Sequence, residues 1–203
     1  YDTIIHNYLK DSKLSNDFTL TYSKHSDMRY GENPHQAAAA FQIPGDKSNG
    51  ILNAKIHQGK KLSYNNIMDA DAALSCLKEF KSIACVIVKH ANPCGVALGT
   101  NMLDVYKRAF AADSISAFGG IIAINQPCDD LLAEEISKVF VEIVLAPAFT
   151  KKSLDIFSKK KNLRVLEVGN IEKRDQLLEV RNIVGGVIVQ ETDVSILSKS
   201  ELK

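Results

Sequence analysis

Behind Ser63, apolar residues recur with the three- or four-residue spacing of one helix face. This stripe consists of Ile67, Ala70, Leu74 and Leu77. Serine is a preferred helix N-cap, because its hydroxyl accepts a backbone N–H of the first turn. The sequence therefore predicts a helix that begins at this cap. Asn65, Asn66 and Asp69 fall in its first turns, and we expect them to support the start of the helix.

Short apolar runs predict the strands. Residues 84–88 form such a run, which ends before Asn-Pro and Gly, as an interior strand with a tight exit does. Further strands are predicted at 18–22, 37–42, 120–124, 141–146, 163–168 and 187–190, and further helices at 103–110, 130–139 and 153–159. Helices that alternate with short apolar strands indicate a layered α/β domain with a mixed, largely parallel sheet flanked by helices.

The end of the 84–88 run carries the first candidate chemistry. Lys89 and His90 follow it directly, and ligands of open α/β sheets sit beyond the carboxyl ends of such strands. Both side chains can move protons or stabilise charge, but a strand that merely ends in solvated polar residues would look the same. Adjacent strand residues point to opposite faces, so the two can reach one ligand only if the chain has turned, which Asn92-Pro93 favours.

Two glycine-containing loops supply further candidates. Arg29 and Tyr30 begin the loop 29–36, where a guanidinium could hold a phosphate, although an ordinary surface arginine fits equally well. In the second loop, Phe118 precedes Gly119 and Gly120, whose lack of a side chain would let the backbone approach a flat ligand. A tight turn into the following strand is the alternative there.

Composition narrows the class of protein. The chain has 203 residues, and its 25 Lys and Arg against 24 Asp and Glu give no electrostatic case for nucleic acid or an anionic membrane. No apolar segment approaches the ~20 residues that span a bilayer. The four cysteines show no CxxC pair or zinc-like spacing, so we expect no metal and a reduced, cytosolic setting. Residues 1–17 are polar and predict a linker.

Four sequence blocks together resemble one family, the bifunctional purine-biosynthesis enzymes that join AICAR transformylase to IMP cyclohydrolase. The blocks are Arg29-Tyr-Gly-Glu-Asn-Pro-His-Gln36, Leu62-Ser-Tyr-Asn-Asn-Ile-Met-Asp-Ala-Asp71, Lys89-His-Ala-Asn-Pro-Cys-Gly95 and Ser116-Ala-Phe-Gly-Gly-Ile-Ile-Ala123. The similarity extends from about Tyr22 to the end of the chain. Single blocks would be weak signals, but four long blocks in this order are specific.

The resemblance implies a fold and a reaction. Residues 18–203 would be the first of two cytidine-deaminase-like subdomains of the transformylase region, without the cyclohydrolase domain and the second subdomain. The reaction would transfer a formyl group from 10-formyltetrahydrofolate, as co-substrate, to the 5-amino group of AICAR. Family members are homodimers with transformylase sites at the subunit interface. We expect this chain alone to be inactive, since most folate contacts lie in the second subdomain.

The resemblance also implies roles for individual residues. His90 would take the amine proton and Lys89 would stabilise the oxyanion on the formyl carbon. Arg29 and Tyr30 would contact the 5′-phosphate. Gly119, next to Phe118, would lie against the nucleotide. Glu142 would accept from the ribose hydroxyls, at a position where an acidic residue is expected and one family member carries Asp.

The sequence also allows or excludes other functions. A non-catalytic nucleotide-binding or dimerisation module of the same fold is the main alternative, and the Lys-His pair argues against it. IMP cyclohydrolase chemistry would belong to the preceding domain. There is no Rossmann, Walker A, HExxH or G-x-S-x-G signature, and Cys94 has no partner for the zinc arrangement of the deaminases.

Overall fold

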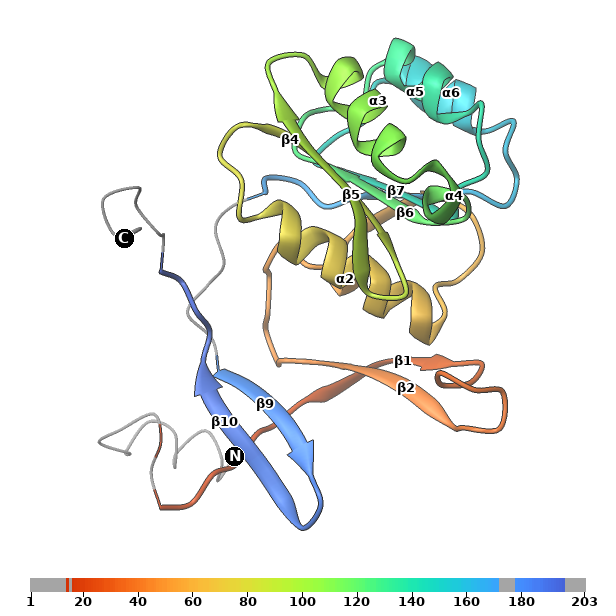
Figure 1. Ribbon diagram of the computed structural model, residues 1–203. Helices are drawn as coiled ribbons and strands as arrows, with labels where there is room; N and C mark the ends of the chain where they lie inside the picture. The colour runs from red at the N-terminus through yellow and green to blue at the C-terminus, as the bar shows by residue number, and fades with distance from the viewer. Residues whose placement is uncertain (1–13, 15, 172–177, 196–203) are drawn as a thin grey trace. The chain divides into compact units, whose positions relative to one another are not determined.

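A computed structural model describes residues 14, 16–171 and 178–195 of the chain (Figure 1). The chain divides into two units, which are described separately. The larger unit runs from residue 23 to residue 172, and the smaller unit combines residues 1–22 with 173–203. Most of the predicted linker, residues 1–17, lies outside the described residues.

The larger unit is built around a six-stranded mixed sheet. In spatial order, its strands are β3 (Lys55–Gln58), β8 (Arg164–Glu167), β7 (Ile143–Ala146), β6 (Ile121–Ile124), β4 (Ile83–Lys89) and β5 (Asn92–Gly99). The β6–β7 and β7–β8 pairs are parallel, whereas β3–β8, β4–β6 and β4–β5 are antiparallel. The predicted layered α/β fold with a mixed sheet is confirmed, with parallel pairing confined to three neighbouring strands.

Helices cover both faces of this sheet. Figure 1 shows α2 (Tyr64–Leu77) on one face and α3 (Met102–Ala112), α5 (Asp130–Ile136) and α6 (Lys151–Phe157) on the other. Successive strand residues point to opposite layers: in β4, Val86 packs in the core beside α2, and Cys85 and Ile87 pack in the core beside the other helices. Burial on both faces explains why the central strands read as continuous apolar runs.

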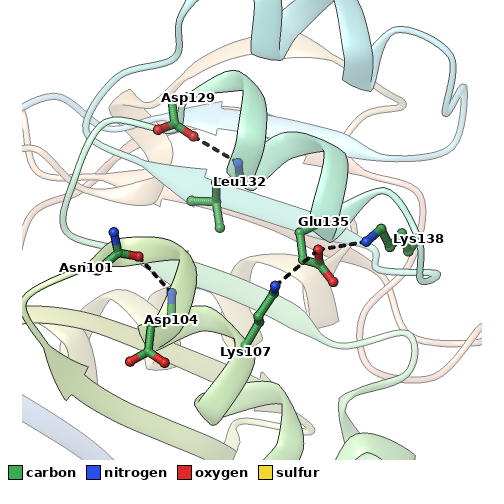
Figure 2. Close-up of polar contacts among 7 residues, drawn as sticks. All are labelled: Asn101, Asp104, Lys107, Asp129, Leu132, Glu135 and Lys138. Carbon is green, nitrogen blue, oxygen red and sulfur yellow. Dashed lines mark hydrogen bonds and ion pairs between the residues drawn. The ribbon is translucent and has the colours of Figure 1, made fainter.

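The helix starts follow the sequence closely. Ser63 and Asn66 form a reciprocal capping box at the start of α2, as the N-cap prediction required. Asn101 caps α3 and Asp129 caps α5, each accepting a backbone N–H of the first turn (Figure 2). A short helix, α4 (Ser114–Ala117), and a 3-10 turn, η1 (Ile51–Asn53), complete the helical segments of the larger unit.

One carboxylate ties α3 to α5. Glu135 of α5 lies 2.8 Å from Nζ of Lys138 and 3.7 Å from Nζ of Lys107 on α3 (Figure 2). The hydrogen bond from Lys138, with a smaller contribution from Lys107, lowers the pKa of Glu135. This polar bridge crosses the rim of the helical layer, outside the apolar core.

Among the described residues, one predicted strand is absent, and another pairs outside the main sheet. Residues 18–22 form no strand, and the side chains of Leu20 and Tyr22 are exposed. The strand in this region is instead β1 (Ser23–Met28), which pairs with β2 (Ala38–Gln42), and β2 confirms the strand predicted at 37–42. The predicted strand at 187–190 belongs to β10 (Gly186–Glu191), which pairs with β9 (Leu178–Ile183) in the smaller unit rather than with the six-stranded sheet.

Neither edge strand of the main sheet was predicted. β3 and β5 each expose apolar side chains, with Ile56 at 47% and Leu98 at 42% exposure, so neither shows the continuous burial of an interior strand. Within the described part of the chain, no helix combines the length and the apolar character that crossing a bilayer requires.

Candidate active site

A cavity of about 390 Å³ lies where β4 ends and α2 begins. Of the seven catalytic or binding candidates from the sequence, four line it: Lys89, His90, Gly119 and Glu142. Because β4 runs antiparallel to β6, the cavity lies at the carboxyl end of β4 but at the amino ends of β6 and β7. A cavity therefore lies beyond the end of β4, where the site was expected, although the neighbouring strands contribute their opposite ends.

The chain turns sharply at His90. β4 ends at Lys89 and β5 begins at Asn92, so His90 and Ala91 form a two-residue hairpin turn. Their φ angles are 53° and 57°. Asn92-Pro93 was predicted as the turn, and that prediction is wrong, because both residues already belong to β5. The condition for a shared site still holds, since Lys89 closes the strand while His90 has left it.

Two side chains brace this turn. Oδ1 of Asp69, on α2, accepts a hydrogen bond from the backbone N–H of Ala91 at 2.7 Å. Nδ2 of Asn92 donates to the carbonyl oxygen of His90 at 2.8 Å. Asp69 was expected only to support the start of its helix. Its contact with a turn 22 residues away is visible only in the folded chain.

Lys89 is anchored by the backbone of a neighbouring loop. Its Nζ donates to the carbonyl oxygen of Phe118 at 2.8 Å. The Phe118 ring does not line the cavity; it is 58% exposed and packs against Phe140, with the ring centroids 5.4 Å apart. An ammonium group has three donors, so this contact leaves two for a ligand.

The two glycines after Phe118 lie in different surroundings. Gly119 lines the cavity with φ 72°, and its N–H donates to the carbonyl oxygen of Phe140 at 2.8 Å. A Cβ on Gly120 would lie 2.9 Å from the carbonyl oxygen of Val88. At Gly120 the close approach is therefore made by β4, and only Gly119 faces the space that a ligand could fill.

Glu142 precedes β7 and is held from two sides. Its Oε2 accepts from Nδ2 of Asn66 at 2.8 Å and lies 3.9 Å from Nη1 of Arg164. Asn66 is only 6% exposed, and its Oδ1 also accepts from the backbone N–H of Ser63 at 3.2 Å. The orientation of this carboxylate thus depends on the capped start of α2.

Arg29 and Tyr30 lie outside the lining of this cavity. The Arg29 guanidinium carbon lies 5.6 Å from the centre of the Tyr30 ring, a cation–π contact. From the same loop, Glu32 does line the cavity, and the sequence had not singled it out. Its position inside the 29–36 block was the only available signal. The loop is braced by Gln36, whose Oε1 accepts from the backbone N–H of Asn33 at 2.7 Å.

The cysteines and possible metal ligands are dispersed in the described residues. No group of three or more His, Cys, Asp or Glu side chains that could hold a metal ion comes together in this part of the chain. Cys94 is half-buried on β5, and its Sγ lies 3.6 Å from the carbonyl oxygen of Ile87. Burial raises the pKa of its thiol.

Comparison with known proteins places the chain in a family. Residues 1–203 match the family described as the AICARFT/IMPCHase bienzyme, and the chain belongs to that family. The bifunctional purine biosynthesis protein PurH of Leuconostoc citreum is 47% identical over 203 residues, covering all of this chain and 40% of that protein. PurH of Bacillus cereus strain B4264 is 46% identical over 206 residues, again covering all of this chain and 40% of the relative.

These matches confirm the family resemblance found in the four sequence blocks. The chain spans about 40% of the length of the curated relatives that it matches.

Proposed function

We propose that this chain is part of the AICAR transformylase region of a bifunctional purine-biosynthesis protein. The reaction is formyl transfer from 10-formyltetrahydrofolate to the 5-amino group of AICAR, giving FAICAR on the route to IMP. The observation that carries the proposal is that Lys89 and His90, with Gly119 and Glu142, line one cavity. Family membership supports it, because the relatives are named as bifunctional purine biosynthesis proteins.

The chemistry needs a base and an oxyanion stabiliser. The 5-amino group is a weak nucleophile, because its lone pair is delocalised into the ring and the adjacent carboxamide. In the proposed step, the amine nitrogen bonds to the formyl carbon while the imidazole of His90 takes the amine proton. The Lys89 ammonium, already fixed by Phe118, donates to the oxygen on which negative charge develops. The formyl carbon–N10 bond then breaks, and N10 of tetrahydrofolate receives a proton.

The remaining contacts orient the nucleotide. Glu142 accepts from the ribose hydroxyls, and its hydrogen bond to Asn66 supports this assignment by fixing the carboxylate at the cavity wall. Gly119 lets the nucleotide approach the backbone. Arg29 and Tyr30 hold the 5′-phosphate; support for this role comes from the 29–36 block alone, since neither residue lines the cavity.

The proposal extends to the longer protein. Residues 18–203 form its first cytidine-deaminase-like subdomain. The second subdomain supplies most folate contacts, and a preceding domain carries IMP cyclohydrolase activity. The protein acts in the cytosol as a homodimer with AICAR and the folate as its partners, and it binds no metal in this chain, no nucleic acid and no membrane. The 203-residue chain alone does not turn over, because orientation of both substrates can supply roughly 7–11 kcal/mol of the catalysis.

The test is isotope-traced formyl transfer by the full-length protein with and without His90. We expect His90→Ala to lower turnover by roughly 100-fold or more, with little change in AICAR affinity. His25→Ala is the matched control, because His25 is exposed on β1 and outside the cavity lining. Cyclohydrolase activity measured on the same preparations reports whether the protein is intact.

Two outcomes would contradict the proposal. Near-normal turnover by His90→Ala would remove the base assignment. AICAR binding by the unsubstituted full-length protein without any formyl transfer would favour the non-catalytic binding module instead.

A further inference from the structure

We propose that Asp69 is a positioning residue for the reaction: its carboxylate holds the His90–Ala91 turn in the left-handed conformation and so directs the imidazole into the cavity. The functional consequence rests on the proposed role of His90 as the base. The role in holding the turn does not, and it can be measured separately.

The turn has an unfavourable sequence for its shape. Both central residues of a two-residue hairpin turn of this kind need positive φ, which is why Asn-Gly and Gly-Gly are preferred there. His90 and Ala91 have φ 53° and 57°, and neither is glycine. An L side chain is crowded against the backbone in that region, so such a conformation persists only where its surroundings hold it.

Asp69 stabilises this turn by accepting a hydrogen bond from the backbone N–H of Ala91, which is not part of the β4–β5 ladder. Lys89 and Asn92 are register partners and close the β4–β5 ladder, so the N–H of Ala91 lies within the turn. This N–H donates to Oδ1 of Asp69 at 2.7 Å, the short end of the range for such bonds. A carboxylate acceptor also makes the bond stronger than one between neutral groups.

The carboxylate itself sits on a rigid support. Asp69 lies on α2, whose first turn is fixed by the capping box of Ser63 and Asn66. The next residue, Ala70, is fully buried in the core beside this face of the sheet. On the other side of the turn, Asn92 donates to the carbonyl oxygen of His90. Both turn residues are therefore held from outside the turn.

Kinetics of the full-length protein test the positioning role. We expect Asp69→Ala to lower kcat for formyl transfer by about 10- to 100-fold, with KM for AICAR changed less than about threefold, since a misplaced base affects the transition state more than binding. Asp69→Asn should recover kcat to within about threefold, because the amide oxygen can accept the same bond. A rise in KM with unchanged kcat would overturn the role and make Asp69 a substrate-binding residue.

A second variant tests the mechanism directly. Glycine adopts positive φ without crowding, so Ala91→Gly should reduce the need for the Asp69 contact. The loss of kcat caused by Asp69→Ala is measured twice, once in the unsubstituted protein and once in the Ala91→Gly variant. In the Ala91→Gly variant this loss should be at least about threefold smaller. Equal losses in the two backgrounds would show that Asp69 does not act through the backbone of this turn.

Hydrogen exchange separates this inference from the proposed function. Mass spectrometry on the full-length protein should show faster exchange in peptides that contain the Ala91 amide in Asp69→Ala, and near-normal exchange in Asp69→Asn. Asp155→Ala, at an exposed position on α6, is the matched control and should show no change there. Unchanged exchange in Asp69→Ala would show that Asp69 does not stabilise the turn. Faster exchange with normal kcat would show that stabilising the turn does not matter for catalysis.

Discussion

Asn66 joins the start of α2 to the carboxylate of Glu142 through a 2.8 Å hydrogen bond between residues 76 positions apart. The same side chain completes the capping box with Ser63, so its carbonyl oxygen and its amide group are both used. Helix capping and the orientation of a cavity carboxylate therefore depend on one buried amide. A substitution at this position should affect both stability and ligand binding.

Asn66→Ala should lower the free energy of unfolding by about 1–2 kcal/mol, because the backbone N–H of Ser63 loses its acceptor in the capping box and Glu142 loses its donor. It should also weaken AICAR binding. Asn101→Ala, which removes the cap of α3, is the matched control and should lower stability without changing affinity. Denaturant unfolding and calorimetric titration measure the two effects. Unchanged AICAR affinity in Asn66→Ala would contradict the assignment of Glu142 to the nucleotide.

Lys89→Ala should reduce the rate of formyl transfer by roughly 100-fold, the typical effect of losing one oxyanion donor. Lys89→Arg should recover only part of the rate, because the planar guanidinium cannot donate to Phe118 and to the oxyanion in the same geometry. Lys81→Ala, at an exposed position before β4, serves as the control in steady-state assays. Full activity of the arginine variant would mean that positive charge alone suffices.

Arg29→Ala should weaken binding of AICAR by about 1.5–3 kcal/mol while leaving its dephosphorylated riboside nearly unaffected, since only the nucleotide offers a phosphate. Calorimetric titration of both ligands is the measurement. Arg108→Ala, which removes an exposed guanidinium bound to Asp104 on α3, is the control. Equal losses for the two ligands would show that Arg29 supports its loop through the contact with Tyr30.

Gly95→Ala should destabilise the larger unit by about 1–3 kcal/mol, because the added methyl group overpacks the contact between β5 and α3. Its Cβ would lie 2.1 Å from the carbonyl oxygen of Ala109, and backbone atoms cannot move aside as a flexible side chain can. At Gly50 the nearest atom to such a Cβ is Oγ of Ser48 at 3.4 Å, so Gly50→Ala should be close to neutral. Urea denaturation compares the two variants, and similar midpoints would refute the packing argument.

Cys128 should contribute to the loss of stability at alkaline pH. Burial raises the pKa of its thiol from 9.0 to about 12. Between these values the unfolded chain has lost the thiol proton while the folded chain keeps it, so unfolding releases a proton. The contribution of this buried thiol to the free energy of unfolding is fully present below pH 9. It falls by about 1.4 kcal/mol per pH unit as the pH rises toward 12.

Cys128→Ser removes this titration, so its free energy of unfolding should decline less steeply than that of the unsubstituted protein over this range. Other groups titrate in both proteins and cancel in the comparison. Parallel declines in urea denaturation series at about pH 9 to 10.5 would show that the thiol does not contribute.

Local sequence determined the central elements of this protein. Ser63 and the apolar stripe behind it predicted α2, and the run at 84–88 predicted β4, because capping and core burial depend on residues within the same segment. The four sequence blocks likewise identified the family, and residues 1–203 match the model of that family. Lys89 and His90 were singled out as candidates from their place at the end of a strand, which needs no knowledge of distant contacts.

Tertiary structure decided what depends on distant partners. β5 and β3 exist because edge strands take their hydrogen bonds from a neighbour, while their exposed side chains leave a weak local pattern. The turn falls at His90–Ala91 rather than at Asn92-Pro93 because the β4–β5 register and Asp69 outweigh the local turn preference. The bonds from Ala91 to Asp69 and from Asn66 to Glu142 join separate elements. Such contacts form only when the chain folds, so no local spacing could predict them.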